Sequence, residues 1–98
     1  MSAIERAVVG RKTPADGKLE ITAALAHELG GDGAEIEVRV ASAEVRGVVE
    51  AMPCTCAKAG ASGKHEHHFV QCDVFRELGV GTQLQLTARR ARLEVALA

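Results

Sequence analysis

The sequence predicts a mostly β fold: a small closed barrel of two fused strand–helix–strand–strand repeats, with two short helices. The first observation is that short apolar–polar alternations, typical of half-buried strands, recur along the chain between glycine-containing turns. The second is the composition, which is 47% hydrophobic but has no Trp, no Tyr and two Phe. Ala, Val and Leu must therefore fill the core, which favours a small, tightly layered barrel over a large sandwich.

The first half of the chain is expected to contain four strands. They are residues 5–9, 19–21, 35–40 and 45–49, the third of which alternates strictly between polar and apolar residues. Residues 10–17 are predicted to form a turn, because Pro14 fixes φ and Gly17 permits a positive φ. Three strands are expected in the second half, at residues 68–70, 84–86 and 93–97.

Each half is also expected to contain one short helix. In the first half, Thr22 is a suitable N-cap for a helix over residues 23–29, and Gly30 follows at the position where helices commonly end. In the second half, residues 73–78 form the helix and Gly79 ends it.

The two halves resemble each other in order and apolar pattern. A shift of 49 places lays residues 77–79, Glu-Leu-Gly, on residues 28–30. After one deleted residue, Gly81 lies on Gly33, Leu84 on Ile36, Leu86 on Val38 and Leu93 on Val45. This predicts an internal duplication within one domain, 1–98, with repeats of about 1–49 and 50–98. The alternative is that any two strand–helix–strand units match this well by chance.

The strongest chemical signal lies between Pro53 and Cys72, which contains all three cysteines and three of the four histidines. Residues two apart on a strand share a face, so the Cys-x-Cys and His-x-His pairs can each point one way. A hairpin over residues 53–68 would bring the pairs together as a ligand set for tetrahedral zinc. The predicted ligands are Cys54, Cys56, His65 and His67.

Other roles for this segment stay open. His68 points to the opposite face of a regular strand and is the alternative ligand if one of the four predicted ligands does not bind. Cys72 suits a buried apolar position. The segment can also be an inert solvated loop, or it can carry thiol chemistry, because a Cys-x-Cys pair can form a strained, reducible disulfide. Four protein ligands close a zinc site, and Glu66 alternates away from His65 and His67, so the chain is not expected to be an enzyme.

Charge and hydropathy restrict the partners and the location. The net charge is −1, so no overall basic field favours nucleic acid. No apolar run is long enough to span a bilayer, and the first residues have no secretory pattern. The chain is therefore expected to be cytoplasmic, not to bind a membrane, and to be a monomer or a homodimer. An odd number of cysteines also favours thiolate ligands over disulfides.

Two segments carry a resemblance to a known family. Residues 16–30, Asp-Gly-Lys-Leu-Glu-Ile-Thr-Ala-Ala-Leu-Ala-His-Glu-Leu-Gly, and residues 33–40, Gly-Ala-Glu-Ile-Glu-Val-Arg-Val, resemble the AbrB/SpoVT/MazE swapped-hairpin domain. The resemblance implies an interlocked barrel, here within one chain, and a DNA-binding transcription regulator. Related cradle-loop and double-psi barrels fit the same pattern.

The family's DNA-binding face comes from the first strand and the turn after it. The matching basic residues here are Arg11, Lys12 and Lys18, with Lys58 and Lys64 as candidates on the second hairpin. Duplex DNA is therefore the first expected partner, in a zinc-binding AbrB-like regulator. The alternative function, which the low net charge favours, is a zinc-stapled module for protein–protein interaction without nucleic-acid binding.

Overall fold

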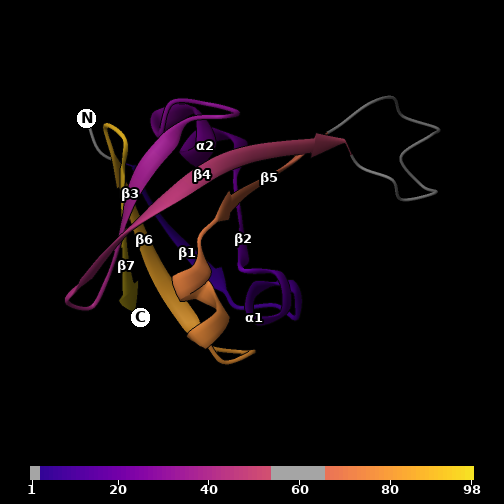
Figure 1. Ribbon diagram of the computed structural model, residues 1–98, viewed down its shortest axis with the longest axis vertical. Coiled ribbons are helices and arrows are strands. Elements are labelled where there is room, and N and C mark those ends of the chain that lie inside the picture. The colour runs from indigo at the N-terminus through magenta and orange to yellow at the C-terminus, as the bar shows by residue number, and fades with distance from the viewer. Residues whose placement is uncertain (1–2, 54–65) are drawn as a thin grey trace.

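The computed structural model describes residues 3–53 and 66–98 (Figure 1). Seven strands, two α-helices and one 3₁₀ helix follow one another along these residues. In chain order they are β1 (Ala3–Val8), α1 (Lys12–Asp16), β2 (Lys18–Ile21), α2 (Ala23–Glu28), β3 (Glu35–Val40), β4 (Ala43–Pro53), β5 (Glu66–Gln71), η2 (Asp73–Glu77), β6 (Gln83–Arg89) and β7 (Arg92–Leu97).

All seven strands belong to one curved sheet, in the order β1-β6-β7-β3-β4-β5-β2. Every neighbouring pair is antiparallel except β3 and β7, which run parallel. Among the described residues, the two edge strands β1 and β2 do not pair with each other. The barrel is therefore nearly closed, with an opening between these two strands. α2 contacts both β1 and β5. The predicted mostly β, barrel-like fold with short helices is therefore confirmed.

The core is built from aliphatic side chains, as the composition predicts. Alternate residues of each strand point inward, so side chains from the concave face of the curved sheet meet one another and form the core. The largest fully buried side chains are Phe75, Leu19, Leu25, Leu29, Leu84, Leu86, Leu93, Val9, Val38, Val49 and Val70. Each such burial stabilises the fold by roughly 1.5–3 kcal/mol.

α2 begins and ends where the sequence predicts. The backbone N–H of Leu25 donates to Thr22 Oγ1 at 3.2 Å, and the same hydroxyl donates to the Glu5 carboxylate of β1 at 2.7 Å. At the other end Gly30 follows the C-cap residue Leu29 with a φ of 116°. The Thr22 cap thus also ties the start of α2 to the edge strand β1.

The prediction of a simple turn at residues 10–17 was wrong, because five of these residues form α1. Pro14 is tolerated since it lies in the first helical turn, where its missing N–H breaks no helical hydrogen bond. Thr13 anchors α1 by being buried, and Gly17 ends the helix with the expected positive φ, 69°. The second predicted helix is present as η2, a 3₁₀ helix whose last bond runs from Leu78 N–H to the Phe75 carbonyl.

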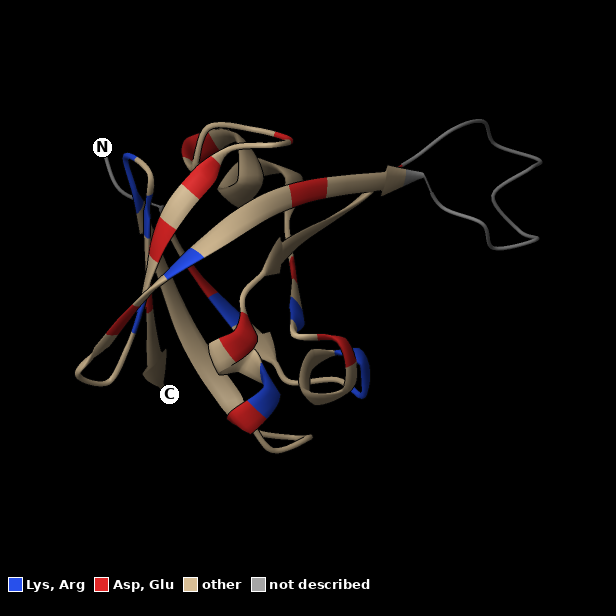
Figure 2. Ribbon diagram, in the orientation of Figure 1, with Lys and Arg blue, Asp and Glu red and all other residues tan. Residues whose placement is uncertain are grey.

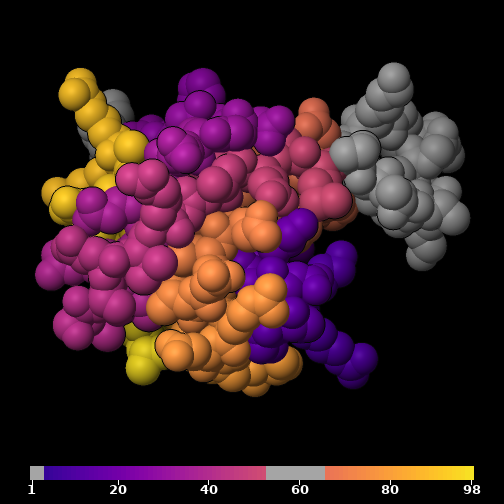
Figure 3. All heavy atoms as spheres, in the orientation of Figure 1, coloured from indigo at the N-terminus to yellow at the C-terminus, as the bar shows by residue number. Residues whose placement is uncertain are grey.

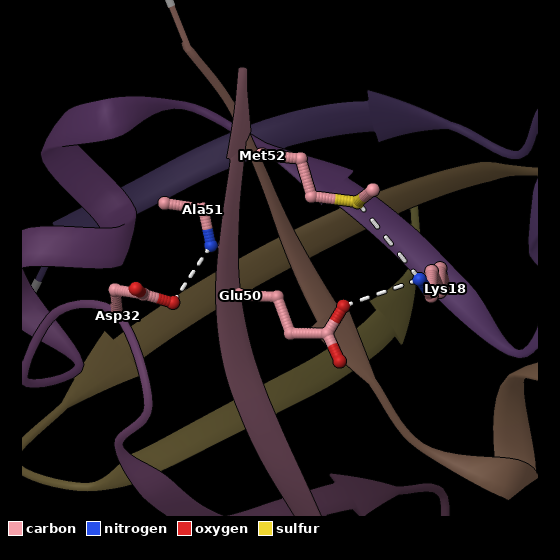
Figure 4. Close-up of polar contacts among 5 residues, drawn as sticks. All are labelled: Lys18, Asp32, Glu50, Ala51 and Met52. Atoms are coloured by element: carbon pink, nitrogen blue, oxygen red, sulfur yellow. Dashed lines mark hydrogen bonds and ion pairs between the residues drawn. The ribbon is translucent and has the colours of Figure 1, made fainter.

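β4 is longer than predicted and changes partner along its length. Up to Val48 it pairs with β3, and from Val48 to Pro53 it pairs with β5. β3 begins at Glu35, which pairs with Val48, so beyond Val48 this edge of β4 faces the loop that precedes β3. There Gly33 N–H donates to the Val49 carbonyl at 2.7 Å. Asp32 Oδ1 then accepts from the Ala51 N–H at 2.9 Å (Figure 4). β4 is therefore hydrogen-bonded along both edges here, to β5 on one side and to Gly33 and Asp32 on the other.

Strands that are distant in sequence interlock. β1 pairs with β6, β2 with β5 and β3 with β7, so each of the first three strands pairs with a strand that follows β4 in the chain. α1 also lies beside η2, as the bordering indigo and orange residues of Figure 3 show. The division of this single barrel into two duplicated repeats stays a prediction.

Candidate metal centre

The candidate metal centre lies where β4 and β5 run together away from the rest of the sheet (Figure 1). The last described pair of this ladder is Pro53 with Glu66. Cys54 follows Pro53 in the chain and His65 precedes Glu66, so the ladder pairs the two described residues that flank residues 54–65, called here the Cys/His segment. The predicted ligands Cys54, Cys56 and His65 lie outside the described residues, and the fourth, His67, lies on β5.

His67 belongs to the outer face of a three-stranded surface. On this face Phe69 of β5 pairs with Glu20 of β2 on one side and with Glu50 of β4 on the other. Two residues before Phe69, His67 pairs with Met52. The adjacent inward-facing row is buried and consists of Leu19, Val70 and Val49. The alternation therefore turns Glu20, Glu50 and His67 to the outside.

Glu20 and His67 are in direct contact. His67 Nδ1 lies 2.9 Å from Glu20 Oε2, although the two residues are 47 positions apart in the sequence. The His67 ring also lies against Phe69, with centroids 6.5 Å apart and planes tilted by 41°. Sequence reasoning missed Glu20, because its partner depends on the pairing of β2 with β5. The outward position of Glu20 in Leu19-Glu-Ile21 was the one available signal.

His68 lies on the opposite face from His67, as strand alternation predicts. It pairs with Ile21 of β2 and Ala51 of β4 and is half-buried. Its Nδ1 atom is buried and has no hydrogen-bond partner among the described residues. The structure therefore does not bring His68 to the side of the sheet that carries His67.

Cys72 carries a free thiol that is buried between β5 and η2. Its backbone N–H donates to the Gly17 carbonyl at 2.8 Å, and its side chain belongs to the hydrophobic core. Burial raises the pKa of the Cys72 thiol, and the negative charge of Asp73 raises it further. A hydrogen bond from the Val74 backbone N–H acts in the opposite direction and lowers this pKa. These surroundings agree with the apolar role expected for Cys72.

The predicted first hairpin is absent from the described residues, because β1 pairs with β6 and β2 with β5. Of its predicted DNA contacts, Arg11 precedes α1, Lys12 is the first residue of α1, and Lys18 is the first residue of β2, which α1 contacts. Lys18 Nζ forms an ion pair with Glu50 Oε2 at 3.2 Å and lies 3.9 Å from Met52 Sδ (Figure 4). Lys12 Nζ lies 6.0 Å above the Phe69 ring, and Arg11 is exposed. Lys58 and Lys64 lie outside the described residues.

Acidic residues are interspersed with these basic ones, as Figure 2 shows. Asp16 lies on α1, and Glu20 and Glu50 belong to the same outer face as Lys18. In residues 3–53 and 66–98 there is no group of three or more His, Cys, Asp or Glu that could hold a metal ion. Three of the four candidate ligands, however, fall between these two ranges.

A groove of about 750 Å³ lies elsewhere, along β3, β6 and β7. Its lining is mainly apolar and includes Leu78, Val95 and the exposed Leu97. Its two charged lining residues, Arg39 and Glu94, are neighbours across the parallel β3–β7 ladder. Of the predicted site residues that the structure describes, none (His67, Arg11, Lys12 or Lys18) lines this groove.

Comparison with protein-family models, with curated proteins and with solved structures finds no match. Within the part of the chain that the structure describes, no helix is long and apolar enough to cross a membrane.

Proposed function

We propose that this chain is a zinc-binding β-barrel module in which Cys54, Cys56, His65 and His67 hold the ion at the β4–β5 hairpin. The observation that carries the proposal is the β4–β5 ladder, which continues to Pro53 and Glu66 and includes His67. Two thiolates and two imidazoles are the usual set for structural zinc. A small core with few aromatic residues gains stability from such a staple.

The proposed role of the stapled hairpin is to present a surface to a protein partner. This is supported by the charges around the hairpin base, where Lys18 is paired with Glu50 and Lys12 covers Phe69. A DNA duplex approaching this side would meet the carboxylates of Glu20 and Glu50 as well as the basic residues. Phosphate contacts require cations that are available to the backbone of the duplex.

A DNA-binding regulator of the AbrB-like type is the second candidate. It is favoured by one observation, that α1, which Arg11 precedes and Lys12 opens, packs against β2, which Lys18 opens. A gel-shift series against duplex DNA at two salt concentrations separates the two roles. A shift that weakens steeply with salt would support DNA binding, and no shift at micromolar protein would leave the protein-interaction role.

Metal content tests the shared part of both roles. Elemental mass spectrometry of tag-free protein is expected to give one zinc per chain, and chelation is expected to lower the melting temperature. Cys54→Ser should lower both quantities, whereas the control Cys72→Ala should leave the metal content unchanged. A full complement of zinc in Cys54→Ser, or none in the unmodified protein, contradicts the proposal.

A further inference from the structure

We infer that the groove along β3, β6 and β7 binds a small organic cation, one that has an apolar body and a single ammonium group. The groove has a volume of about 750 Å³ and a mainly apolar lining. Its lining residues belong to a different part of the sheet from the β4–β5 ladder. Binding of such a ligand is therefore independent of the proposed zinc site.

The apolar part of the groove lies where β7 ends. Leu84 and Leu97 are partners in the β6–β7 ladder, and Val40 and Val95 are partners in the β3–β7 ladder. Leu97 is 76% exposed, although its ladder partner Leu84 is 1% exposed and belongs to the core. Leu97 thus extends the apolar surface of the core into solvent. A ligand that covers this surface removes it from water, which is favourable.

The charged part of the groove contains a carboxylate that lacks a partner. Glu94 and Arg39 are neighbours across the β3–β7 ladder, but Arg39 Nε lies 3.9 Å from Glu44 Oε1 on its other side. In residues 3–53 and 66–98, the half-buried Glu94 carboxylate forms no hydrogen bond and no ion pair. The uncompensated charge of the groove is therefore negative, which favours a cation over an anion as the ligand.

The polar neighbours of Glu94 favour an ammonium group as this cation. Thr87 is the partner of Glu94 in the β6–β7 ladder, and Gln85 lies two residues before Thr87, so the three side chains share one face. All three residues line the groove. A primary ammonium group has three N–H donors, and a carboxylate, a hydroxyl and an amide oxygen can accept from them. Ala96, the partner of Gln85, is small and leaves room on this face.

The size of the groove favours a small molecule over a protein partner. Pockets for small molecules typically have volumes of about 300–1,000 Å³ and combine apolar walls with a few polar groups. The volume of about 750 Å³ falls within this range. Eleven of the described residues line the groove, whereas a stable protein interface uses about 20–30 residues on each side.

The test is an NMR titration of the unmodified chain with three probes that share one alkyl chain. They are octylammonium, octanol and octanoate, whose head groups are positive, neutral and negative. Octylammonium is expected to bind most tightly and octanoate most weakly, with the largest shifts at the methyl groups of Leu78, Val95 and Leu97. Equal affinities for the three probes, or shifts confined to residues outside the groove, would overturn the inference.

Three variants separate the two parts of the groove. Glu94→Gln is expected to weaken octylammonium binding by about 10-fold, the size of one charge-assisted hydrogen bond, and to leave octanol binding unchanged. Leu97→Ala, at an exposed position, should weaken the binding of both probes. Glu35→Gln is the control, because it removes the same charge from an exposed residue of β3 that does not line the groove. Equal losses of octylammonium affinity in Glu94→Gln and Glu35→Gln would overturn the inference.

Light scattering on the same samples tests a second copy of the chain as the occupant of the groove. Leu97→Asp is expected to leave the molecular mass in solution unchanged, and circular dichroism verifies that all variants are folded. A dimer that Leu97→Asp dissociates would assign the groove to a second copy of the chain and would also overturn the inference.

Discussion

Gly47 lies directly against Val38, and a Cβ at position 47 would approach Val38 Cγ2 to 2.8 Å. The same Cβ would lie 3.1 Å from the Gln71 carbonyl oxygen and 3.4 Å from Cys72 Cβ. Gly47 therefore permits β4 to pass close to both β3 and β5 at the point where it changes partner.

Gly47→Ala is expected to destabilise the protein by roughly 1–3 kcal/mol, because the added methyl group must displace packed atoms. Urea unfolding measures the change in the free energy of unfolding. Gly10→Ala is the control, since a Cβ at Gly10 meets nothing within 4 Å. Equal stability of the two variants would show that β4 relaxes without cost.

Thr22→Ala is expected to lower the free energy of unfolding by about 1 kcal/mol, the usual cost of removing an N-cap. The hydroxyl accepts from Leu25 N–H and donates to Glu5, so its removal leaves both groups without this partner. Thermal or urea unfolding measures the loss. Thr22→Ser keeps the hydroxyl and should retain most of the stability, and a loss as large as that of Thr22→Ala would assign the effect to the methyl group.

Ala91→Gly is expected to stabilise the protein by up to about 1 kcal/mol, because Ala91 has a left-handed φ of 51° that glycine adopts without steric cost. Ala91 lies in the turn between β6 and β7. The melting temperature should rise for this variant and fall for the control Ala96→Gly, which places glycine inside β7. A fall in both would mean that the gain in backbone freedom of the unfolded chain dominates at the turn.

The Cys72 thiol is expected to resist modification in the folded protein. It is 3% exposed, and burial raises its pKa, so little thiolate is available to a reagent near pH 8. Labelling followed by peptide mass spectrometry should show that Cys72 reacts at the rate of unfolding. Rapid labelling of Cys72 in native buffer would contradict its burial.

The same raised pKa predicts a dependence of stability on pH. Folding favours the neutral thiol, so the contribution is fully present below the unfolded pKa of about 8.5 and decreases as the pH rises above it. The difference in free energy of unfolding between the unmodified protein and Cys72→Ala should therefore shrink between pH 8 and pH 10. A difference that is constant over this range would show that Cys72 does not titrate on unfolding.

Features that depend on local chemistry were predictable from the sequence. The strict alternation of Glu35–Val40 gave β3 its observed bounds, and Thr22 and Gly30 marked the two ends of α2. The positive φ of Gly17 was also expected from its turn chemistry, although the helix it ends was not. α1 is too short to show helical periodicity, and it forms because Thr13 is buried and η2 packs against it.

Features that depend on strand pairing were not predictable. No local pattern indicates that β3 lies parallel to β7, or that β2 pairs with β5. The contact of Glu20 with His67 is a consequence of the second pairing, and so the candidate site was predicted without it. The ion pair of Lys18 with Glu50 was missed for the same reason.

The parallel pairing of β3 with β7 also bears on how the chain folds. Val38 and Leu93 are neighbours in this ladder but lie far apart in the sequence, so their contact closes a long loop of the chain. Such non-local contacts carry a loop-closure cost before they contribute stability, and folds that depend on them form slowly. The β3–β4 and β6–β7 hairpins can form early from local contacts. The centre of the sheet, in contrast, forms only when β7 pairs with β3. Refolding of this small chain is accordingly expected on the time scale of milliseconds to seconds typical of β barrels, instead of the microseconds typical of helical bundles.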